Sequence, residues 1–181
     1  KTMQVHTPGE AAALGIETVY QDLALCDNLD IVQNMFLGRE ETELGTFDEG
    51  KMESEASETL RSLSVRTVKS VRQKVSSLSG GQRQTVAIAR SVLKVVMLDE
   101  PTAALGVAQT EQVLALVTRL AERGVGVLMI SHNLVDVFQV ADYINVLYLG
   151  QMVASVETSR TTSDDVVGYI TGSKTYTGVP A

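Results

Sequence analysis

The stretch "LSGGQRQTVAIARSVLKVVMLDEP", residues 78–101, decides the fold. It opens with Ser79, and Gln82 follows at the spacing of a capping box, which predicts that a helix starts here. After the helical portion, the apolar run 94–98 has the length of a buried strand. The run ends in two adjacent carboxylates. The stretch therefore predicts a glycine-rich helix start followed by a strand that carries two acids at its end.

Two further apolar runs, 125–130 and 143–149, have the same character. None of the three runs alternates between apolar and polar residues, as expected for a parallel sheet covered on both faces. Between the first two runs, apolar residues follow helical spacing and Gly124 is placed to end the helix, so the segment predicts a βαβ unit. We therefore predict an α/β fold with a helical insertion over roughly 30–93. Further predicted elements are a strand over 16–20 and helices over about 49–63, 133–142 and 163–170.

Composition narrows the class of protein. The net charge of −7 argues against a nucleic-acid binder, which needs a basic surface. Cys26 is the only cysteine, so no disulfide can form within the chain, and a reducing compartment fits. No apolar run approaches the ~20 residues of a membrane span, and the first residues lack the apolar stretch of a signal peptide. Any association with a membrane is therefore expected to be peripheral.

The helix start and the strand end each have a functional and an ordinary interpretation. Gly80 and Gly81 leave backbone N–H groups approachable, and the positive end of the helix dipole attracts phosphate. The alternative is an ordinary capped helix. Asp99 and Glu100 end a strand at the sheet edge where α/β proteins bind ligands. Because successive strand residues point to opposite sides, one acid could hold Mg²⁺ while the other orients or deprotonates a water. The alternative is a solvated strand end.

Other polar side chains also follow predicted strands. His132 follows the second apolar run, and Ser131 or Asn133 is the expected N-cap of the next helix. A lone histidine is more often structural than catalytic, and His6 receives the structural interpretation. Gln21 follows the first predicted strand, and its amide oxygen can bind Mg²⁺ or a water. Each of these residues taken singly is a weak signal.

Taken in order, Gln21 after a strand, LSGGQ, VVMLDE and a strand ending before His132 closely resemble the ATP-binding-cassette (ABC) ATPases over essentially the whole chain. The wording of "GIETVYQDLAL", "DEPTAALG" and "ISHNLVDVFQVAD" is similar to the ATPase subunits of bacterial monosaccharide importers of the xylose, ribose and fructose type. The resemblance implies a P-loop NTPase-like parallel sheet core with an α-helical signature subdomain, incomplete at the N-terminus. It divides the chain into a core remnant up to the Q-loop (1–29), the helical signature subdomain (30–93), the α/β catalytic core with Walker B, D-loop and H-loop (94–172), and a tail (173–181).

The resemblance also implies roles for individual residues. Glu100 would be the general base or water-orienting carboxylate, and His132 would contact the γ-phosphate. Asp99 would hold Mg²⁺ through water, and Gln21 would reach the same ion. In the family two cassettes pair head to tail, so the signature would close over ATP held by the partner, which supplies the positioning and charge neutralisation that phosphoryl transfer needs. The signature residues are Ser79, Gly80, Gly81 and Gln82, and the D-loop residues are Ala103, Ala104, Leu105 and Gly106.

Three features depart from the family pattern. The Gly-x-x-x-x-Gly-Lys-Ser/Thr loop that cradles the β- and γ-phosphates is absent from the sequence, so we expect the chain by itself to be inactive. The run from Arg90 to Asp99 is shorter than usual, which suggests that residues are missing between Leu93 and Lys94. Gly106 stands where the family's D-loop usually carries an aspartate. Related sugar-importer ATPases often share this feature, so it does not indicate inactivation.

The predicted function is an ATP-binding and ATP-hydrolysing subunit of an ABC importer that powers monosaccharide uptake, with ATP and Mg²⁺ as cofactors. Its expected partners are a second cassette, a transmembrane sugar permease and, indirectly, an extracytoplasmic sugar-binding protein, but no nucleic acid. The segment 22–38 lies where the family forms its permease-coupling groove. The expected location is cytoplasmic, peripheral on the inner face of the cell membrane. One alternative is a truncated, non-catalytic cassette that supplies LSGGQ in trans. Another is a soluble cassette protein of translation or DNA repair, which would need basic surfaces or coiled-coil insertions that the sequence lacks.

Overall fold

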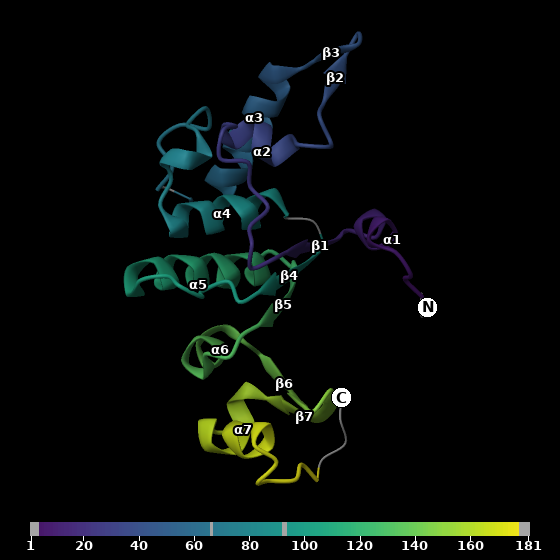
Figure 1. The fold of residues 1–181 in the computed structure, drawn as a ribbon, viewed down its shortest axis with the longest axis vertical. Coiled ribbons are helices and arrows are strands. Elements are labelled where there is room, and N and C mark those ends of the chain that lie inside the picture. The colour runs from purple at the N-terminus through teal and green to yellow at the C-terminus, as the bar shows by residue number, and fades with distance from the viewer. Residues whose placement is uncertain (1–3, 66, 92–93, 178–181) are drawn as a thin grey trace. The chain divides into compact units, whose positions relative to one another are not determined.

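The computed structural model describes residues 4–65, 67–91 and 94–177 (Figure 1). They form two compact units, Lys1–Ile130 and Ser131–Ala181. The four-part division implied by the resemblance stays a prediction. The suggested gap between Leu93 and Lys94 involves Leu93, which lies outside the described residues. Within the described part of the chain, no helix combines the length and the apolar composition that crossing a bilayer requires.

The first unit contains a three-stranded parallel sheet in the order β1-β4-β5. The strands are β1 (Ile16–Val19), β4 (Val95–Asp99) and β5 (Gly126–Ile130). Parallel pairing aligns Val19 with Leu98 and Asp99 with Ile130, so the carboxyl ends of all three strands meet at one edge. The side chains of Val96 and Leu98 are fully buried. These strands confirm the predicted α/β class.

The helix α5 (Val107–Glu122) connects β4 to β5 and completes the predicted βαβ unit. Full burial of each of its apolar side chains contributes about 1.5–3 kcal/mol to folding. The helix ends as predicted, because Gly124 follows it with a φ of 80°, a left-handed conformation that glycine adopts without strain. Its buried residues are Val113, Leu114, Leu116, Val117 and Leu120.

A helical cluster lies between β1 and β4 in the chain. Figure 1 shows α4 alongside α5 and next to α2 and α3, in agreement with the contacts among these helices. Arg72 links the start of α2 to α3 through ion pairs with Asp30 at 3.5 Å, Glu49 at 3.3 Å and Glu53 at 2.8 Å. The elements are α2 (Ile31–Phe36), the short strands β2 (Thr42–Glu43) and β3 (Thr46–Phe47), α3 (Glu49–Ser62), the 3₁₀ turn η1 (Val75–Ser77) and α4 (Gly80–Arg90), while α1 (Pro8–Ala13) precedes β1.

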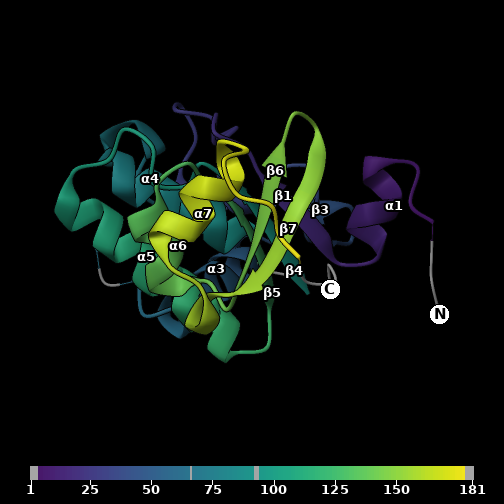
Figure 2. The same cartoon turned by 90° about the horizontal axis from the view of Figure 1, so that it is seen from below.

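The second unit corrects one expectation. The run 143–149 was expected in the parallel sheet, but β6 (Tyr143–Tyr148) pairs antiparallel with β7 (Gln151–Glu157), a strand that the sequence patterns did not indicate. Leu149 and Gly150 connect them with φ values of 47° and 79°, the backbone of a tight hairpin turn. The hairpin is visible in Figure 2. Its apolar side packs against α7 (Ser163–Ile170) and α6 (Leu134–Val140), and η2 (Thr158–Arg160) links β7 to α7.

Candidate functional site

The carboxyl edge of the sheet brings three of the predicted site residues together. Asp99 is the last residue of β4, and Glu100 follows it. Gln21 comes shortly after β1, which pairs in parallel register with β4. Parallel strands that are in register end at the same edge, so Gln21, Asp99 and Glu100 share it. Both carboxylates are half-buried, whereas the glutamine is exposed.

The backbone at Glu100 differs from the predicted strand end. Glu100 has a φ of 47°, in the left-handed region that costs a side-chain-bearing residue roughly 1–2 kcal/mol. Its N–H donates to the Ile130 carbonyl at 2.9 Å, and its own carbonyl accepts from the N–H of Ala103 at 3.1 Å. The acid therefore lies on a tight turn anchored to β5. The strand alternation used to assign the two acids different roles stops at Asp99.

The stretch 103–106, the predicted D-loop, forms the rest of this turn. Ala104 has a φ of 59°, and the N–H of Leu105 donates to the Thr102 carbonyl at 3.3 Å. Gly106 is the N-cap residue of α5. The chain thus goes from the acidic strand end to the start of a helix within one compact turn.

The signature stretch has the predicted cap. The Ser79 hydroxyl accepts from the Gln82 N–H at 3.4 Å, and the Gln82 side chain accepts from the Ser79 N–H at 2.9 Å. The Gln82 amide also donates to the Thr67 carbonyl at 2.5 Å, which ties the preceding loop to the helix start. Gly80 is exposed and Gly81 is buried. A ligand approaching this helix start therefore meets an exposed glycine backbone beside a serine whose cap bond leaves its hydroxyl hydrogen available.

The two arginines Arg39 and Arg90 were missed by the sequence analysis. Arg90, the last residue of α4, donates to the Ala24 carbonyl at 3.0 Å, and Arg39 donates to the Arg90 carbonyl. Burial lowers the pKa of Arg39, an effect that the Glu17 carboxylate opposes and the Arg90 charge reinforces. The segment after Gln21 is thereby tied to the end of the signature helix. No local pattern marks these contacts, because they join residues far apart in the sequence.

His132 lies in the second unit and is exposed. The structure therefore does not relate it to Asp99 and Glu100, and its role stays a prediction. The adjacent Asn133 is the N-cap of α6, because its side chain accepts from the Val135 N–H at 3.1 Å. Of the two predicted caps, Asn133 is thus the correct one.

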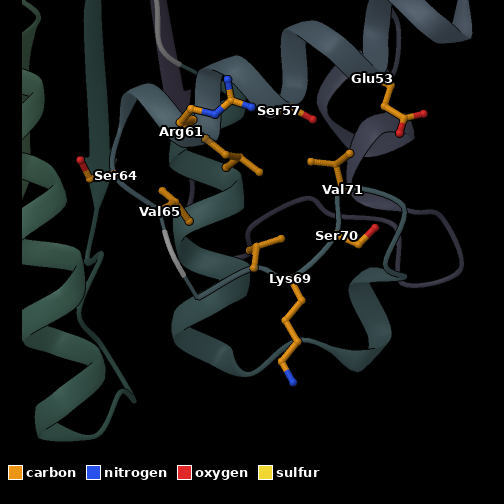
Figure 3. A pocket seen from close by; sticks show the side chains of 10 residues that line it. Glu53, Ser57, Arg61, Ser64, Val65, Lys69, Ser70 and Val71 are labelled. Carbon is orange, nitrogen blue, oxygen red and sulfur yellow. The ribbon is translucent and has the colours of Figure 1, made fainter.

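A recess in the first unit lies away from these residues. A surface pocket of about 520 Å³ is formed by α3 and the loop that follows it, with Glu53, Arg61 and Lys69 among its polar lining (Figure 3). None of the predicted site residues lines it. Among the described residues, no group of three or more His, Cys, Asp or Glu side chains could hold a metal ion. Mg²⁺ is usually bound by one or two carboxylates together with substrate phosphates and water, so the sheet edge can supply only part of a magnesium shell.

Known proteins resemble this chain over most of its length. A family model described as ABC transporter matches residues 4–103. The fructose import ATP-binding protein FrcA of Rhizobium meliloti is 44% identical, with 96% of this chain and 71% of the relative covered. The xylose/arabinose import ATP-binding protein XylG of Sulfolobus acidocaldarius is 41% identical over 94% of this chain and 69% of the relative. The ribose import ATP-binding protein RbsA 1 of Rubrobacter xylanophilus is 37% identical over 86% of this chain and 32% of the relative.

Solved structures show the same fold. The ADP conformation of MJ1267, an ATP-binding cassette of an ABC transporter, superposes with a TM-score of 0.71 at 22% identity and covers 92% of this chain and 68% of that chain. A dimeric post-hydrolysis state of the cassette MJ0796 bound to ADP and Pi gives a TM-score of 0.66 at 23% identity, covering 85% and 68%. These similarities show that the chain has the fold of an ATP-binding cassette.

Proposed function

Because the chain belongs to the ABC transporter family, whose ATP-binding proteins are ATPases, we propose that it drives the import of a monosaccharide. The relatives are named for the import of fructose, xylose or arabinose, and ribose, so a small sugar is the best-supported cargo. One structural observation carries the proposal. Gln21, Asp99 and Glu100 share the carboxyl edge of a parallel sheet, in the same unit as a capped helix start with two glycines.

The predicted site residues have different roles in ATP hydrolysis. Glu100, held on its turn beside β5, orients the attacking water and accepts its proton. Asp99 and Gln21 present oxygen atoms, the ligand type that Mg²⁺ prefers, and the neighbouring strands bring them to one edge, so the residues fit this ion. Bound Mg²⁺ would neutralise charge on the phosphates. His132 contacts the γ-phosphate in this proposal.

The signature serves a second nucleotide. Ser79, Gly80, Gly81 and Gln82 bind the phosphates of ATP held by another cassette, through the dipole and backbone N–H groups of α4. Two cassettes therefore pair head to tail and complete two composite sites. This arrangement explains why one short stretch carries both a phosphate-attracting helix start and a carboxylate pair.

Import of a sugar requires further proteins besides the ATPase. We propose a transmembrane permease as the membrane partner, an extracytoplasmic sugar-binding protein as the source of cargo, and the inner face of the cell membrane as the location. The segment 22–38 supplies the permease contact. Within it Ile31 and Met35 are buried in the core, while Leu37 is 46% exposed and available to a partner.

A second candidate function is a cassette that offers its signature to a partner without hydrolysing ATP itself. The capped, glycine-rich start of α4 at Ser79 supports this function, because it can meet phosphate without the carboxylates. ATP turnover separates the two functions. We would measure it for this chain and for a chimaera that joins the N-terminal phosphate-loop segment of FrcA to it. Hydrolysis by the chimaera alone supports the enzyme and the need for the loop. Inert chimaeras would contradict the enzyme, and full turnover by this chain alone would contradict the requirement for the loop.

A further inference from the structure

The N-cap residue of α5 makes no side-chain cap. Gly106 occupies the N-cap position and has no side chain with which to satisfy the first N–H groups of the helix. Instead, a side chain of the helix bonds to the N-cap residue: Oε1 of Gln109 accepts from the Gly106 N–H at 3.3 Å. The end of the D-loop is therefore held by a side chain from the first turn of the following helix.

The same glutamine lies against the signature. A Cβ atom placed on Gly81 would be 2.9 Å from Cβ and 3.0 Å from Cγ of Gln109, closer than side-chain carbons approach one another. The Cβ atom is held directly by the backbone, so it cannot move away unless α5 itself shifts, whereas Cγ could move by rotation about χ1. Gly81 is buried and Gln109 is half-buried. The first turns of α4 and α5 therefore touch at this point, and only glycine fits at position 81.

A second contact joins the same two segments. A Cβ placed on Gly80 would lie 3.4 Å from Cδ2 of Leu105, an ordinary van der Waals distance. Leu105 belongs to the D-loop and Gly80 to the signature. Leu105 of the D-loop thus lies next to Gly80 of the signature. Gln109 packs on Gly81 and bonds to the Gly106 N–H, and we call this pair of contacts the clamp.

We propose that Gln109 is a positioning residue that fixes the D-loop to the signature helix of the same chain. The proposal rests on the function proposed above and deepens it. In a head-to-tail pair, the signature of one chain meets the nucleotide of the other, so a D-loop clamped to that signature moves with it. When the pair closes over ATP, the signature and the D-loop then reach their closed positions together. Loss of the clamp loosens the D-loop in the closed state and slows hydrolysis, while the residues that bind ATP remain.

The test separates the hydrogen bond from the packing. Gln109→Met keeps the Cβ and Cγ atoms that pack on Gly81 but removes the acceptor, whereas Gln109→Glu keeps both. Gln112→Met is the matched control, since Gln112 lies on an exposed face of the same helix. ATP turnover would be measured in the chimaera with FrcA described above, which is the subunit carrying the phosphate-loop segment. Amide hydrogen exchange at Gly106 would be measured in this chain.

We expect Gln109→Met to lower kcat about five-fold, the effect of losing one ordinary hydrogen bond, with KM for ATP changed less than about two-fold. Exchange at Gly106 should speed up in the same variant. Gln109→Glu should restore both values, and Gln112→Met should change neither. Thermal unfolding of each variant corrects the rates for the folded fraction.

The failures of the two proposals differ. Absence of turnover in the parent subunit overturns the proposed ATPase, and hydrogen exchange at Gly106 still decides whether the clamp exists. Normal turnover of Gln109→Met in an active parent overturns the positioning role. A loss of turnover that Gln109→Glu does not restore, or that the folded fraction alone explains, overturns it as well.

Discussion

The two ends of the stretch 78–101 reach their places by different means. At the carboxylate end, backbone pairing fixes Asp99, and a backbone hydrogen bond to the neighbouring strand fixes Glu100. At the glycine end, side chains do this work, because Ser79 and Gln82 cap each other's N–H groups. A side-chain substitution at the carboxylate end should therefore change the chemistry and preserve the frame. At the glycine end, it should disturb the frame itself.

The largest expected effect is at Glu100. In the subunit carrying the phosphate-loop segment, Glu100→Gln removes the group that accepts the proton of water, so turnover should fall by about 10²- to 10⁴-fold. Because backbone atoms hold this turn, the midpoint of thermal unfolding should stay that of the parent. Phosphate release and circular dichroism on the same preparation check both statements. A variant that loses turnover by unfolding would break the contrast between the two ends.

Next in size is Gly81→Ala. The added methyl group would meet Gln109 at 2.9 Å, and such overpacking should lower the free energy of unfolding by about 1–3 kcal/mol. Gly80→Ala is the matched control, because its methyl group meets Leu105 at an ordinary 3.4 Å. Urea unfolding of the two variants gives the difference. Equal stability would show that α4 and α5 do not meet closely at the signature.

A smaller effect is expected for the cap. Ser79→Ala removes the acceptor for the Gln82 N–H and should cost about 1 kcal/mol of stability. Ser79→Thr keeps an acceptor at the same position and should stay within a few tenths of a kcal/mol of the parent. The same urea titration measures both. An unchanged midpoint for Ser79→Ala would mean that side chains do not hold this helix start.

The smallest expected effect is on the stability of the second unit, outside the stretch 78–101. Asp165 pairs with Lys174 at 2.6 Å and also accepts from the Thr162 hydroxyl, and these bonds lower its pKa to about 2. A carboxyl whose pKa is lowered by folding stabilises the folded state above its ordinary pKa of 3.8. That contribution is lost as the pH falls toward about 2. Because the pair is exposed, screening by solvent and salt keeps the effect small.

The measurement for this pair is the carboxyl chemical shift of Asp165 against pH, with Lys174→Met as the perturbed variant. We expect the midpoint to move up toward the ordinary value when the ammonium is removed. Turnover at neutral pH should be unaffected. An unmoved midpoint would show that the pair does not form in solution.

Local rules made part of this molecule readable from its sequence. Three features depend on neighbours a few residues away, and all three were predicted correctly: the cap formed by Ser79 and Gln82, the end of α5 at Gly124 and the strand that ends in Asp99. The strand β7 was missed because the hairpin turn has Leu149 where asparagine or aspartate would have signalled it.

Contacts between distant segments could not be read in the same way. Nothing in the sequence shows that Gly81 meets Gln109, or that Arg90 reaches the carbonyl of Ala24, because the packing of whole helices sets these distances. The backbone of Glu100 also departs from the strand pattern that precedes it. Left-handed conformation at a residue with a side chain is a common mark of a functional turn, and it is not encoded by the residue type.

The most direct test of the central claim, that the two ends of 78–101 serve different nucleotides, is complementation between two inactive variants of the subunit carrying the phosphate-loop segment. Glu100→Gln disables the carboxylate end, and Gly80→Asp places a negative charge where the signature would meet phosphate. Each variant alone should hydrolyse ATP at least about 10²-fold more slowly than the parent. A head-to-tail pair of the two has one site made of an intact carboxylate and an intact signature, so the mixture should recover turnover. A mixture that hydrolyses ATP no faster than its two components would contradict the claim.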